Sequence, residues 1–401
     1  MNHYQTTLSA RPNATTELSL DGRTDAATAV AAEHARRVDR DARFPKEAFE
    51  AIRAQKLLGI LIPVDLGGEG ASFSETADVC YRLGQACAST GMIYAMHQVK
   101  VACLMQHGRA SPAIEALLRK VATEQLLLSS STTEGRAGAN IRASEAAVIC
   151  SGEEFTLERS ATCVSYGAEA DGIVTTARRA PDAEISDQVL VAVLKKDYTL
   201  TPIQSWDTLG MRGTCSIGYL LKVSAHRDYI LPVPYAKIHT ETMVPSAHLL
   251  WGAVWTGIAT DAVARARAFI RHVARQANGQ QPPGAANFAK TQEMLGSLRA
   301  LLASGLSAYE RALHDETTLA SMDFQSMITL RKVRISDLAT TIVLSAMRTC
   351  GLAGYRNDGE FSLGRHLRDI LSSPIMIHND RILASLGAPA LVAGTPRSLR
   401  D

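Results

Sequence analysis

The chain has 401 residues, of which 46% are hydrophobic and 20% charged, which is the composition of a soluble globular protein. This length is too great for one simple core, so we expect two or three packed subdomains. A formal net charge of +2 excludes a strongly basic or acidic surface, so we expect neither nucleic acid nor a membrane surface as partner.

Cysteine usage and hydropathy predict a cytoplasmic protein. The seven cysteines are scattered and form no CxxC pair, which favours free thiols over disulfides or a zinc site. No apolar run approaches the roughly 20 residues that a membrane-spanning helix needs. The first residues, MNHYQTTLSA, lack the apolar segment of a signal peptide.

The first part of the chain predicts helices. Residues 1–24 are polar, and we expect a flexible N-terminal tail there. Apolar residues at helical spacing then predict an N-terminal α-helical domain over residues 25–128. Its helices are expected at residues 25–39, 45–55, 74–88 and 93–107, with the Gly-rich loop PVDLGGEG between the second and the third.

The middle of the chain predicts strands. Short β-rich runs separated by Ser-Gly, Pro-Asp and Gly-rich turns indicate a compact antiparallel β-barrel or sandwich domain over residues 129–236. The clearest runs are residues 146–150, 154–158, 189–194 and 217–223.

Helices return in the last part of the chain. Long apolar-periodic segments predict a C-terminal four-helix bundle over residues 237–401. Its helices are expected at residues 249–275, 288–313, 322–350 and 373–386. The predicted fold class is therefore α+β and mostly α, with two helical domains around a β-domain.

Three peptides of the β-domain carry candidate chemistry. TTEGRAGANIR (132–142) is a Gly-rich turn with hydroxyl side chains, which can offer backbone N–H groups to an anion. It is not a phosphate P-loop, because GxxxxGK[ST] is absent. CVSYGAEAD (163–171) and WDTLGMRGTCS (206–216) follow it, and their order and spacing matter more than either peptide alone.

In this order the peptides resemble the acyl-CoA dehydrogenase family. RQANG (275–279) and CGLAGY…RHLRD (350–369) continue the resemblance, and PVDLGGEGAS and ASTGMIYAMH extend it into the N-terminal part. It spans about residues 25–390. The resemblance implies a flavoprotein oxidoreductase that binds FAD, in a superfamily that also includes flavin monooxygenases and oxidases.

The resemblance implies flavin contacts in the β-domain. Thr133 is expected to contact the isoalloxazine ring, and Ser165 corresponds to a family Thr or Ser that forms a hydrogen bond near flavin N5. Cys163 stands where the family often has a Trp that stacks on the flavin. A smaller side chain there leaves room for a differently shaped pocket.

The resemblance also implies contacts from the C-terminal domain. Arg275 matches an Arg that reaches the FAD pyrophosphate of a neighbouring subunit, a role that suits the bidentate guanidinium. Arg348, Gly351 and Gly354 fall in the segment that contacts the adenosine half of FAD, where the family usually has Gln in place of Arg348. Asn379 falls near a family Thr that touches FAD. A shared FAD site implies a homodimer or homotetramer.

The usual catalytic base is missing. Dehydrogenation of an acyl thioester needs a base for the α-proton, while flavin N5 takes the β-hydride. The family uses a Glu of raised pKa, placed either in the C-terminal segment or at the start of the long helix. The first place is occupied by PIMIH (374–378), with Ile377 at the position of the base, and the second by Leu249 and Leu250.

Several residues are candidates for a substitute base. His378 adjoins the vacant position, and a neutral imidazole accepts a proton. His97 is expected to point toward the acyl pocket, where it would serve as an acid or base or as a wall residue. Asp358 and Glu360 lie in an inserted loop that could fold over the pocket, and Asp380 could face the flavin or pair with Arg381.

Substrate binding also departs from the family. Ala139 replaces a Ser that often holds the phosphate side of CoA, so a phosphopantetheine arm on a carrier protein remains open as the acyl carrier. Leu250 is expected in the substrate-binding region. The small residues near the pocket do not indicate an acyl chain length.

Three functions remain open. The first is α,β-dehydrogenation of an acyl thioester with a relocated base and an unidentified electron acceptor. The second is a flavin mono- or dioxygenase or oxidase on the same fold, in which O2 reacts with the reduced flavin and no α-proton base is needed. The third is a non-catalytic flavin-binding protein. The missing acid and the small Cys163 favour the second over an ordinary dehydrogenase.

Overall fold

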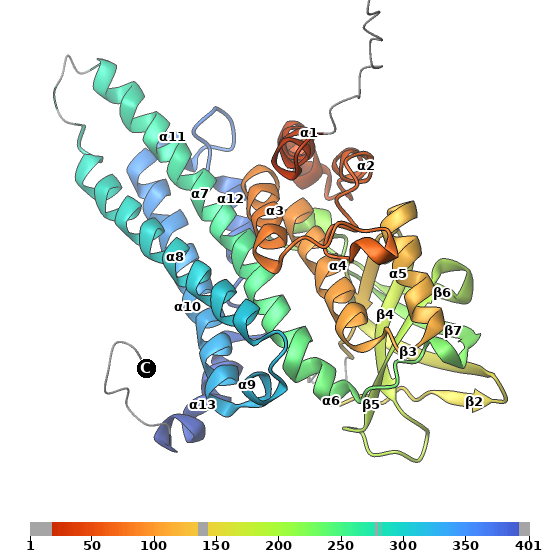
Figure 1. The fold of residues 1–401 in the computed structure, drawn as a ribbon. Helices are drawn as coiled ribbons and strands as arrows, with labels where there is room; N and C mark the ends of the chain where they lie inside the picture. Colours follow the sequence, from red (N-terminus) through yellow and green to blue (C-terminus); the bar gives the residue numbers. More distant parts are fainter. Residues whose placement is uncertain (1–17, 135–142, 277–279, 281, 393–401) are drawn as a thin grey trace, which may run out of the picture.

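The computed structural model describes residues 18–134, 143–276, 280 and 282–392. Figure 1 shows that the helices of the two ends of the chain pack against each other, while the β-domain, which lies between them in sequence, is at the lower right; this confirms the predicted fold class. The expected domain boundaries, after residues 128 and 236, fall inside β1 and α6 respectively.

Five helices form the N-terminal part, and their ends follow from capping residues. The Ser19 side chain accepts from the Gly22 N–H at the start of the first helix, within the expected tail, and Ser72 and Glu75 form a capping box at the start of the third. The fifth helix was not expected. The helices are α1 (Leu20–Asp41), α2 (Lys46–Ala54), α3 (Phe73–Ala86), α4 (Ala88–His107) and α5 (Pro112–Glu124).

The N-terminal helices are packed tightly against the C-terminal part. Helix α4 is buried on nearly all sides. Helix α3 crosses the long helix α7 (Val244–Gln276) at glycines: a Cβ on Gly84 would lie 2.6 Å from the Val254 carbonyl oxygen, and one on Gly257 would lie 2.2 Å from that of Tyr81. Only glycine permits this backbone approach.

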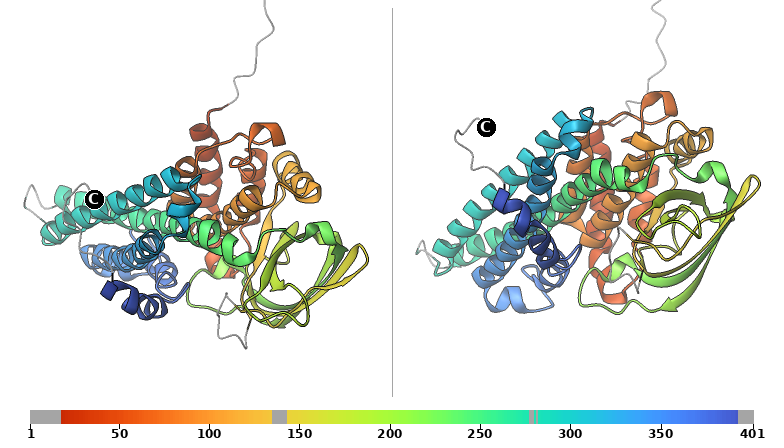
Figure 2. Two further views of the ribbon diagram at one scale, coloured as in Figure 1. Left: turned by 60° about the horizontal axis from the view of Figure 1, so that its bottom comes forward. Right: turned by 90° about the horizontal axis from the view of Figure 1, so that it is seen from below.

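The β-domain consists of two sheets rather than a closed barrel. The first has the order β1-β4-β5 and the second the order β2-β3-β7-β6, and residues of both sheets share one apolar core. Figure 2 shows the sheets curving around this core. The strands are β1 (Leu128–Ser131), β2 (Ile149–Ser151), β3 (Glu154–Val164), β4 (Gly172–Arg178), β5 (Gln188–Leu194), β6 (Tyr198–Gln204) and β7 (Ile217–His226).

One strand pair corrects the expectation of an antiparallel domain. β1 and β4 run parallel, with Leu128 opposite Gly172 and Ser131 opposite Thr175. A parallel pair needs a long crossover connection, and the segment from residue 132 to 171, which includes β2 and β3, provides it.

Three long helices, α7, α8 (Ala285–Ala312) and α10 (Met322–Cys350), lie side by side in the C-terminal part (Figure 1). Shorter helices also pack on α10. The expected helix at residues 373–386 begins only at Asn379, because turns precede it. The remaining elements are α6 (Tyr235–Ile238), the π-helix η5 (His239–Met243), α9 (Glu316–Ala320), α11 (Leu352–Tyr355), α12 (Gly364–Ile370) and α13 (Asn379–Val392).

The described residues also bear on two properties considered in the sequence, which are membrane-spanning segments and cysteine pairing. Among the described helices, none combines the length and the apolar character needed to cross a bilayer. All seven cysteines are unpaired, and three of them are exposed or half-buried: Cys150, Cys163 and Cys215.

Candidate functional site

A chain of hydroxyl groups lies at the end of the β-domain. Ser165 follows β3, Thr214 ends the 3-10 helix η3 (Arg212–Thr214), and Ser216 precedes β7. The Ser165 and Ser216 Oγ atoms are 2.8 Å apart, and the Ser216 Oγ is 2.8 Å from the Thr214 Oγ1. All three side chains are buried. We call these three residues the hydroxyl chain.

The direction of the protons in the hydroxyl chain follows from its end. Thr214 Oγ1 donates its single proton to the Met211 carbonyl, at 2.9 Å. Ser216 therefore donates to Thr214, and Ser165 donates to Ser216, because each hydroxyl has one proton. The Ser165 Oγ is thus left with acceptor capacity only.

The surroundings of the hydroxyl chain suit a polar ring system. Ser131 of β1 has a buried Oγ without a hydrogen-bond partner among the described residues, and such a group is costly unless a ligand or water satisfies it. Thr133 is half-buried just after β1. Cys163 lies beside Ser165 and Ser216, and burial raises the pKa of its thiol. Together these groups fit a hydrogen-bonding cofactor such as a flavin.

The hydroxyl chain is joined to the C-terminal part. The Met211 N–H donates to the Asp369 carboxylate of α12 at 2.7 Å. Burial raises the pKa of Asp369 to about 6. A Cβ on Gly210 would lie 2.0 Å from the Arg368 carbonyl oxygen, so this loop and α12 are in close contact.

The segment with the vacant base position forms a strained turn. Ile377 has φ +51°, a left-handed conformation that is unfavourable for a β-branched residue. It is 38% exposed, and its neighbour His378 is exposed. The His378 side chain forms no hydrogen bond or ion pair with another described residue, whereas Asn379 is buried.

Asn379 holds the turn in place. Its Oδ1 accepts from the Lys332 ammonium at 2.7 Å, and its Nδ2 donates to Ser336 Oγ at 2.8 Å and to Asp337 at 2.9 Å. Lys332 lies 5.6 Å from the ring centre of Trp255 and has no carboxylate within 4 Å among the described residues. Burial lowers its pKa to about 8.

Lys332 and its surroundings were missed in the sequence, although a signal was present. Lys332 interrupts an apolar stripe of α10 that also contains Ile328, Ile335 and Ala339, and lysine is almost never fully buried unless it is paired. His248 is likewise buried in the apolar run of α7, its Nδ1 is unpartnered among the described residues, and burial lowers its pKa to about 3.

The other expected C-terminal residues lie elsewhere. Arg275 near the end of α7 and Arg348 near the end of α10 are both exposed, at the end of the bundle that is remote from the β-sheets (Figure 1). Gly351 has φ +55°, and nothing lies within 4 Å of where its Cβ would be. Gly354 is buried beside Cys350. One protomer therefore does not bring these residues to the hydroxyl chain.

His97 is occupied on both ring nitrogens. Its Nδ1 accepts from the Leu128 N–H at 3.1 Å, and its Nε2 contacts the Leu58 carbonyl at 2.9 Å. Burial lowers its pKa to about 4, so the ring is neutral. This geometry ties α4 to β1.

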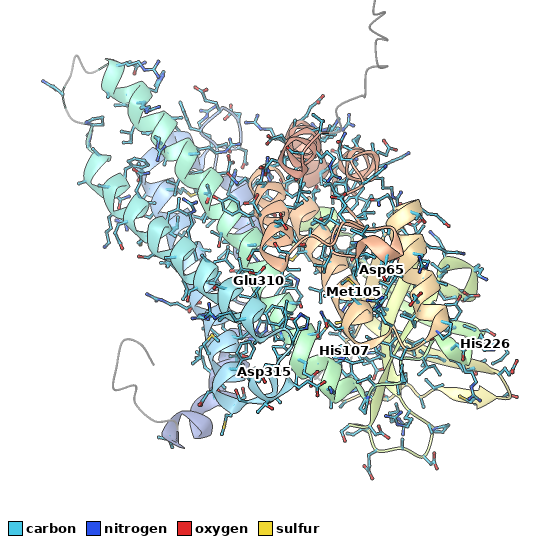
Figure 3. All side chains as sticks on the ribbon, in the orientation of Figure 1. Asp65, Met105, His107, His226, Glu310 and Asp315 are labelled. Atoms are coloured by element: carbon cyan, nitrogen blue, oxygen red, sulfur yellow. The ribbon has the colours of Figure 1, made fainter. Side chains whose placement is uncertain are left out.

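The positions of the two substrate-binding candidates, Leu250 and Ala139, do not define a substrate site. Leu250 is buried in the core, and Ala139 lies outside the described residues. Figure 3 shows His107 at the end of α4, where it borders a small cavity of about 390 Å³ and lies 2.8 Å from Thr242 Oγ1. Within the described ranges, no group of three or more His, Cys, Asp or Glu residues is arranged to hold a metal ion.

Two family models match most of the chain. The family model "Acyl-CoA dehydrogenase, N-terminal domain" matches residues 16–125, and "Acyl-CoA dehydrogenase, C-terminal domain" matches residues 249–388. The cyclohex-1-ene-1-carbonyl-CoA dehydrogenase of Geobacter metallireducens is 25% identical over 381 residues, which are 94% of this chain and 97% of that protein.

Two further similar proteins are not named as dehydrogenases. The amino sugar nitrososynthase DnmZ of Streptomyces peucetius is 23% identical over 354 residues, or 84% of each chain. The FMN-bound structure of TdsC from Paenibacillus sp. A11-2 has the same fold, with a TM-score of 0.81, 19% identity, and coverage of 93% of this chain and 98% of that one.

Proposed function

The chain belongs to the acyl-CoA dehydrogenase family, and we propose that it is an oxygenase of this fold rather than a desaturating dehydrogenase. It is an FAD-dependent oxidoreductase of the acyl-CoA dehydrogenase type. When bound, FAD supplies an electron carrier that can pass two electrons to O2 once it has been reduced.

The observation that carries this proposal is the lack of a base at both family positions. Ile377 occupies one position on a half-exposed turn, and Leu249 and Leu250 are buried apolar residues at the other. Abstraction of an α-proton needs a group whose pKa lies near the working pH. An oxygenase reaction does not require that group.

The hydroxyl chain supports the same proposal. If Ser165 lies beside flavin N5, as the family resemblance implies, its Oγ can only accept a hydrogen bond while the chain keeps its present direction. The N5 of the reduced flavin carries an N–H, whereas that of the oxidised flavin does not. Ser165 would therefore favour binding of the reduced form.

The other candidate residues take supporting roles in this proposal. We assign His97 to positioning β1, because its nitrogens are engaged by backbone groups, and assign no role to His378, which is exposed on the turn. Arg275, Arg348 and the open backbone at Gly351 would serve the FAD of a second copy. Leu352 and Tyr355, which are 73% and 74% exposed beside them, support a homodimer or dimer of dimers.

The reaction balances with one external reductant. Two electrons and two protons from the reductant, with O2, yield one oxygen atom in the product and one in water. The substrate is a CoA or carrier-protein thioester or, as the similarity to an amino sugar nitrososynthase also allows, a nucleophilic small molecule outside that class.

A pair of flavin half-reactions tests the proposal. The oxidised holoenzyme is mixed with a series of acyl-CoAs without oxygen, and the flavin absorbance is followed. We expect no bleaching by acyl-CoAs, and rapid reoxidation by O2 after reduction with an external reductant. Bleaching by an acyl-CoA without oxygen would refute the proposal.

Dehydrogenation is the second candidate. It is favoured by the similarity over 94% of the chain to a protein named as a CoA-ester dehydrogenase. It would require a relocated base, for which His378→Ala is the first variant to test: unchanged bleaching would remove His378 from that role.

A further inference from the structure

One cavity in the described part of the chain has neither a residue of the hydroxyl chain nor a residue of the turn in its lining. Its volume is about 1310 Å³, and helices α1, α3, α7 and α12 and the loop at residues 208–212 form its walls. Binding sites are common at such junctions between domains. None of the residues assigned above to the flavin lines this cavity.

The cavity walls are rich in arginine. Seven arginines line it against four carboxylates, which leaves an excess of three positive charges. We call it the arginine cavity. The lining arginines are Arg36, Arg40, Arg82, Arg212, Arg265, Arg365 and Arg368.

Most of these arginines have carboxylate partners within the protein. Arg82 pairs with Asp25, Arg265 with Asp261 at 2.8 Å, and Arg368 with Asp39. Arg40 pairs with the adjacent Asp41 at 2.7 Å. Three of the seven lining arginines therefore have no close carboxylate partner.

Arg36, Arg212 and Arg365 are poorly paired. Arg36 donates to the Gly359 carbonyl at 2.6 Å and has no carboxylate within 4 Å among the described residues. Arg365 reaches the Ala86 carbonyl at 3.4 Å and the Asp369 carboxylate only at 4.0 Å. Both side chains thus retain guanidinium N–H groups for another acceptor.

Arg212 has fewer partners than Arg36 and Arg365. Its guanidinium forms no hydrogen bond or ion pair with any described residue, and its Nε is fully shielded from solvent. A shielded cationic donor without a partner is costly. An anion that enters the cavity would satisfy it.

We propose that the arginine cavity binds a small phosphate-bearing anion. The guanidinium fork matches phosphate oxygens with two parallel hydrogen bonds, and the three poorly paired arginines match the several negative charges of a diphosphate. The volume exceeds the roughly 300–1,000 Å³ of a usual small-molecule site, so an organic group attached to the phosphates can also be accommodated.

Calorimetric titration of the flavin-loaded protein with inorganic pyrophosphate tests this proposal, with sodium chloride of equal ionic strength in the reference. We expect saturable binding of the wild type. Arg212→Gln and Arg36→Gln should each weaken it about tenfold or more, the usual effect of losing one hydrogen bond to a charged group. Arg36 is exposed, so this second variant is expected to fold even if the first does not.

Arg109→Gln is the matched control. Arg109 is a surface arginine paired with Asp65 at 2.9 Å, away from the cavity, and its loss should leave pyrophosphate binding within about twofold. Absence of saturable binding, or equal binding by wild type and both cavity variants, would overturn the proposal.

Flavin release distinguishes the cavity from the cofactor site. If pyrophosphate displaces FAD in proportion to its own binding, the cavity belongs to the cofactor and the proposal is wrong. Retention of FAD at saturating pyrophosphate is the expected result. Because heat is measured without turnover, this outcome is independent of whether the oxygenase proposal holds.

Discussion

The hydroxyl chain and the turn at residues 374–379 differ in how they are held in place. The hydroxyl chain runs from Ser165 through Ser216 and Thr214 to the Met211 carbonyl, so three successive hydrogen bonds hold its side chains in place. In the turn, backbone hydrogen bonds are supplemented by one buried polar side chain, Asn379, which accepts a hydrogen bond from the buried Lys332. The two regions therefore differ in how sensitive their geometry should be to the loss of a single side chain.

The largest expected effect is on stability, at Asn379. Asn379→Leu removes the acceptor of the Lys332 ammonium and the hydrogen bonds to Ser336 and Asp337. We expect a loss of about 3 kcal/mol in the free energy of unfolding, measured by urea denaturation at neutral pH. Asn357→Leu, at an exposed position, is the control and should change it by less than about 0.5 kcal/mol. A loss below about 1 kcal/mol for Asn379→Leu would mean that the turn is held by other contacts.

The second effect is a pH dependence that arises from Lys332. Burial lowers its pKa from the 10.5 of an exposed lysine to about 8, so between these values the unfolded chain binds more protons than the folded one. Stability contributed by Lys332 therefore rises with pH over this window. Lys332→Met lacks this gain, so it should become less stable relative to the wild type by about 2 kcal/mol from pH 8 to pH 10.

Lys100 offers a matched comparison for this prediction. It is buried, and burial also lowers its pKa to about 8, but it lies on α4 beside Met243 rather than at the turn. Lys100→Met should show the same pH dependence, and the double variant the sum of both. A constant difference between wild type and Lys332→Met across this range would contradict the account.

A smaller effect concerns the backbone of the turn. Ile377→Asn should stabilise the protein by about 1 kcal/mol, because Asn tolerates the left-handed conformation that Ile377 adopts. Ile375→Asn is the control, since Ile375 is 63% exposed and has no positive φ. Thermal unfolding of both variants measures the difference. Equal changes in the two would show that the conformation of Ile377 stores no strain.

The smallest expected effect is on the reduction potential of the bound flavin, through the proposed contact between Ser165 and flavin N5. Ser165→Ala should shift the two-electron reduction potential of the bound flavin by about 10–30 mV toward negative values, the equivalent of one hydrogen bond to the reduced form. Ser129→Ala is the control, because Ser129 Oγ donates to the Ser165 carbonyl at 2.9 Å without entering the hydroxyl chain. A shift toward positive values would mean that Ser165 donates to the oxidised flavin instead.

Local sequence patterns predicted the helices better than the strands. The helix expected at residues 322–350 coincides with α10, because its apolar spacing is long and regular. β1 and β4 were not predicted, since LSSS carries no β-branched residue and GIVTTAR is buried on both faces and does not alternate. Their parallel pairing joins segments about 44 residues apart, which no local pattern encodes.

The candidate site was predictable in part. Ser165 could be singled out from a family resemblance, but its partner Ser216 is 51 residues away and only the fold joins them. The vacancy at Ile377 was visible in the sequence, whereas the anchoring of Asn379 by Lys332 spans 47 residues. The placement of Arg275 and Arg348 at the far end of the bundle depends on helix lengths that only the structure supplies.

The most direct test of the central claim, that no base acts on an α-proton, is deuterium exchange at the α-carbon of acyl-CoAs. The oxidised holoenzyme is incubated without oxygen in D2O with acyl-CoAs of short, medium and long chain, and proton NMR follows the α-CH2 signal. We expect exchange no faster than in the absence of protein. Catalysed exchange with any of these acyl-CoAs would show that a base acts on the α-proton, and the oxygenase proposal would be wrong.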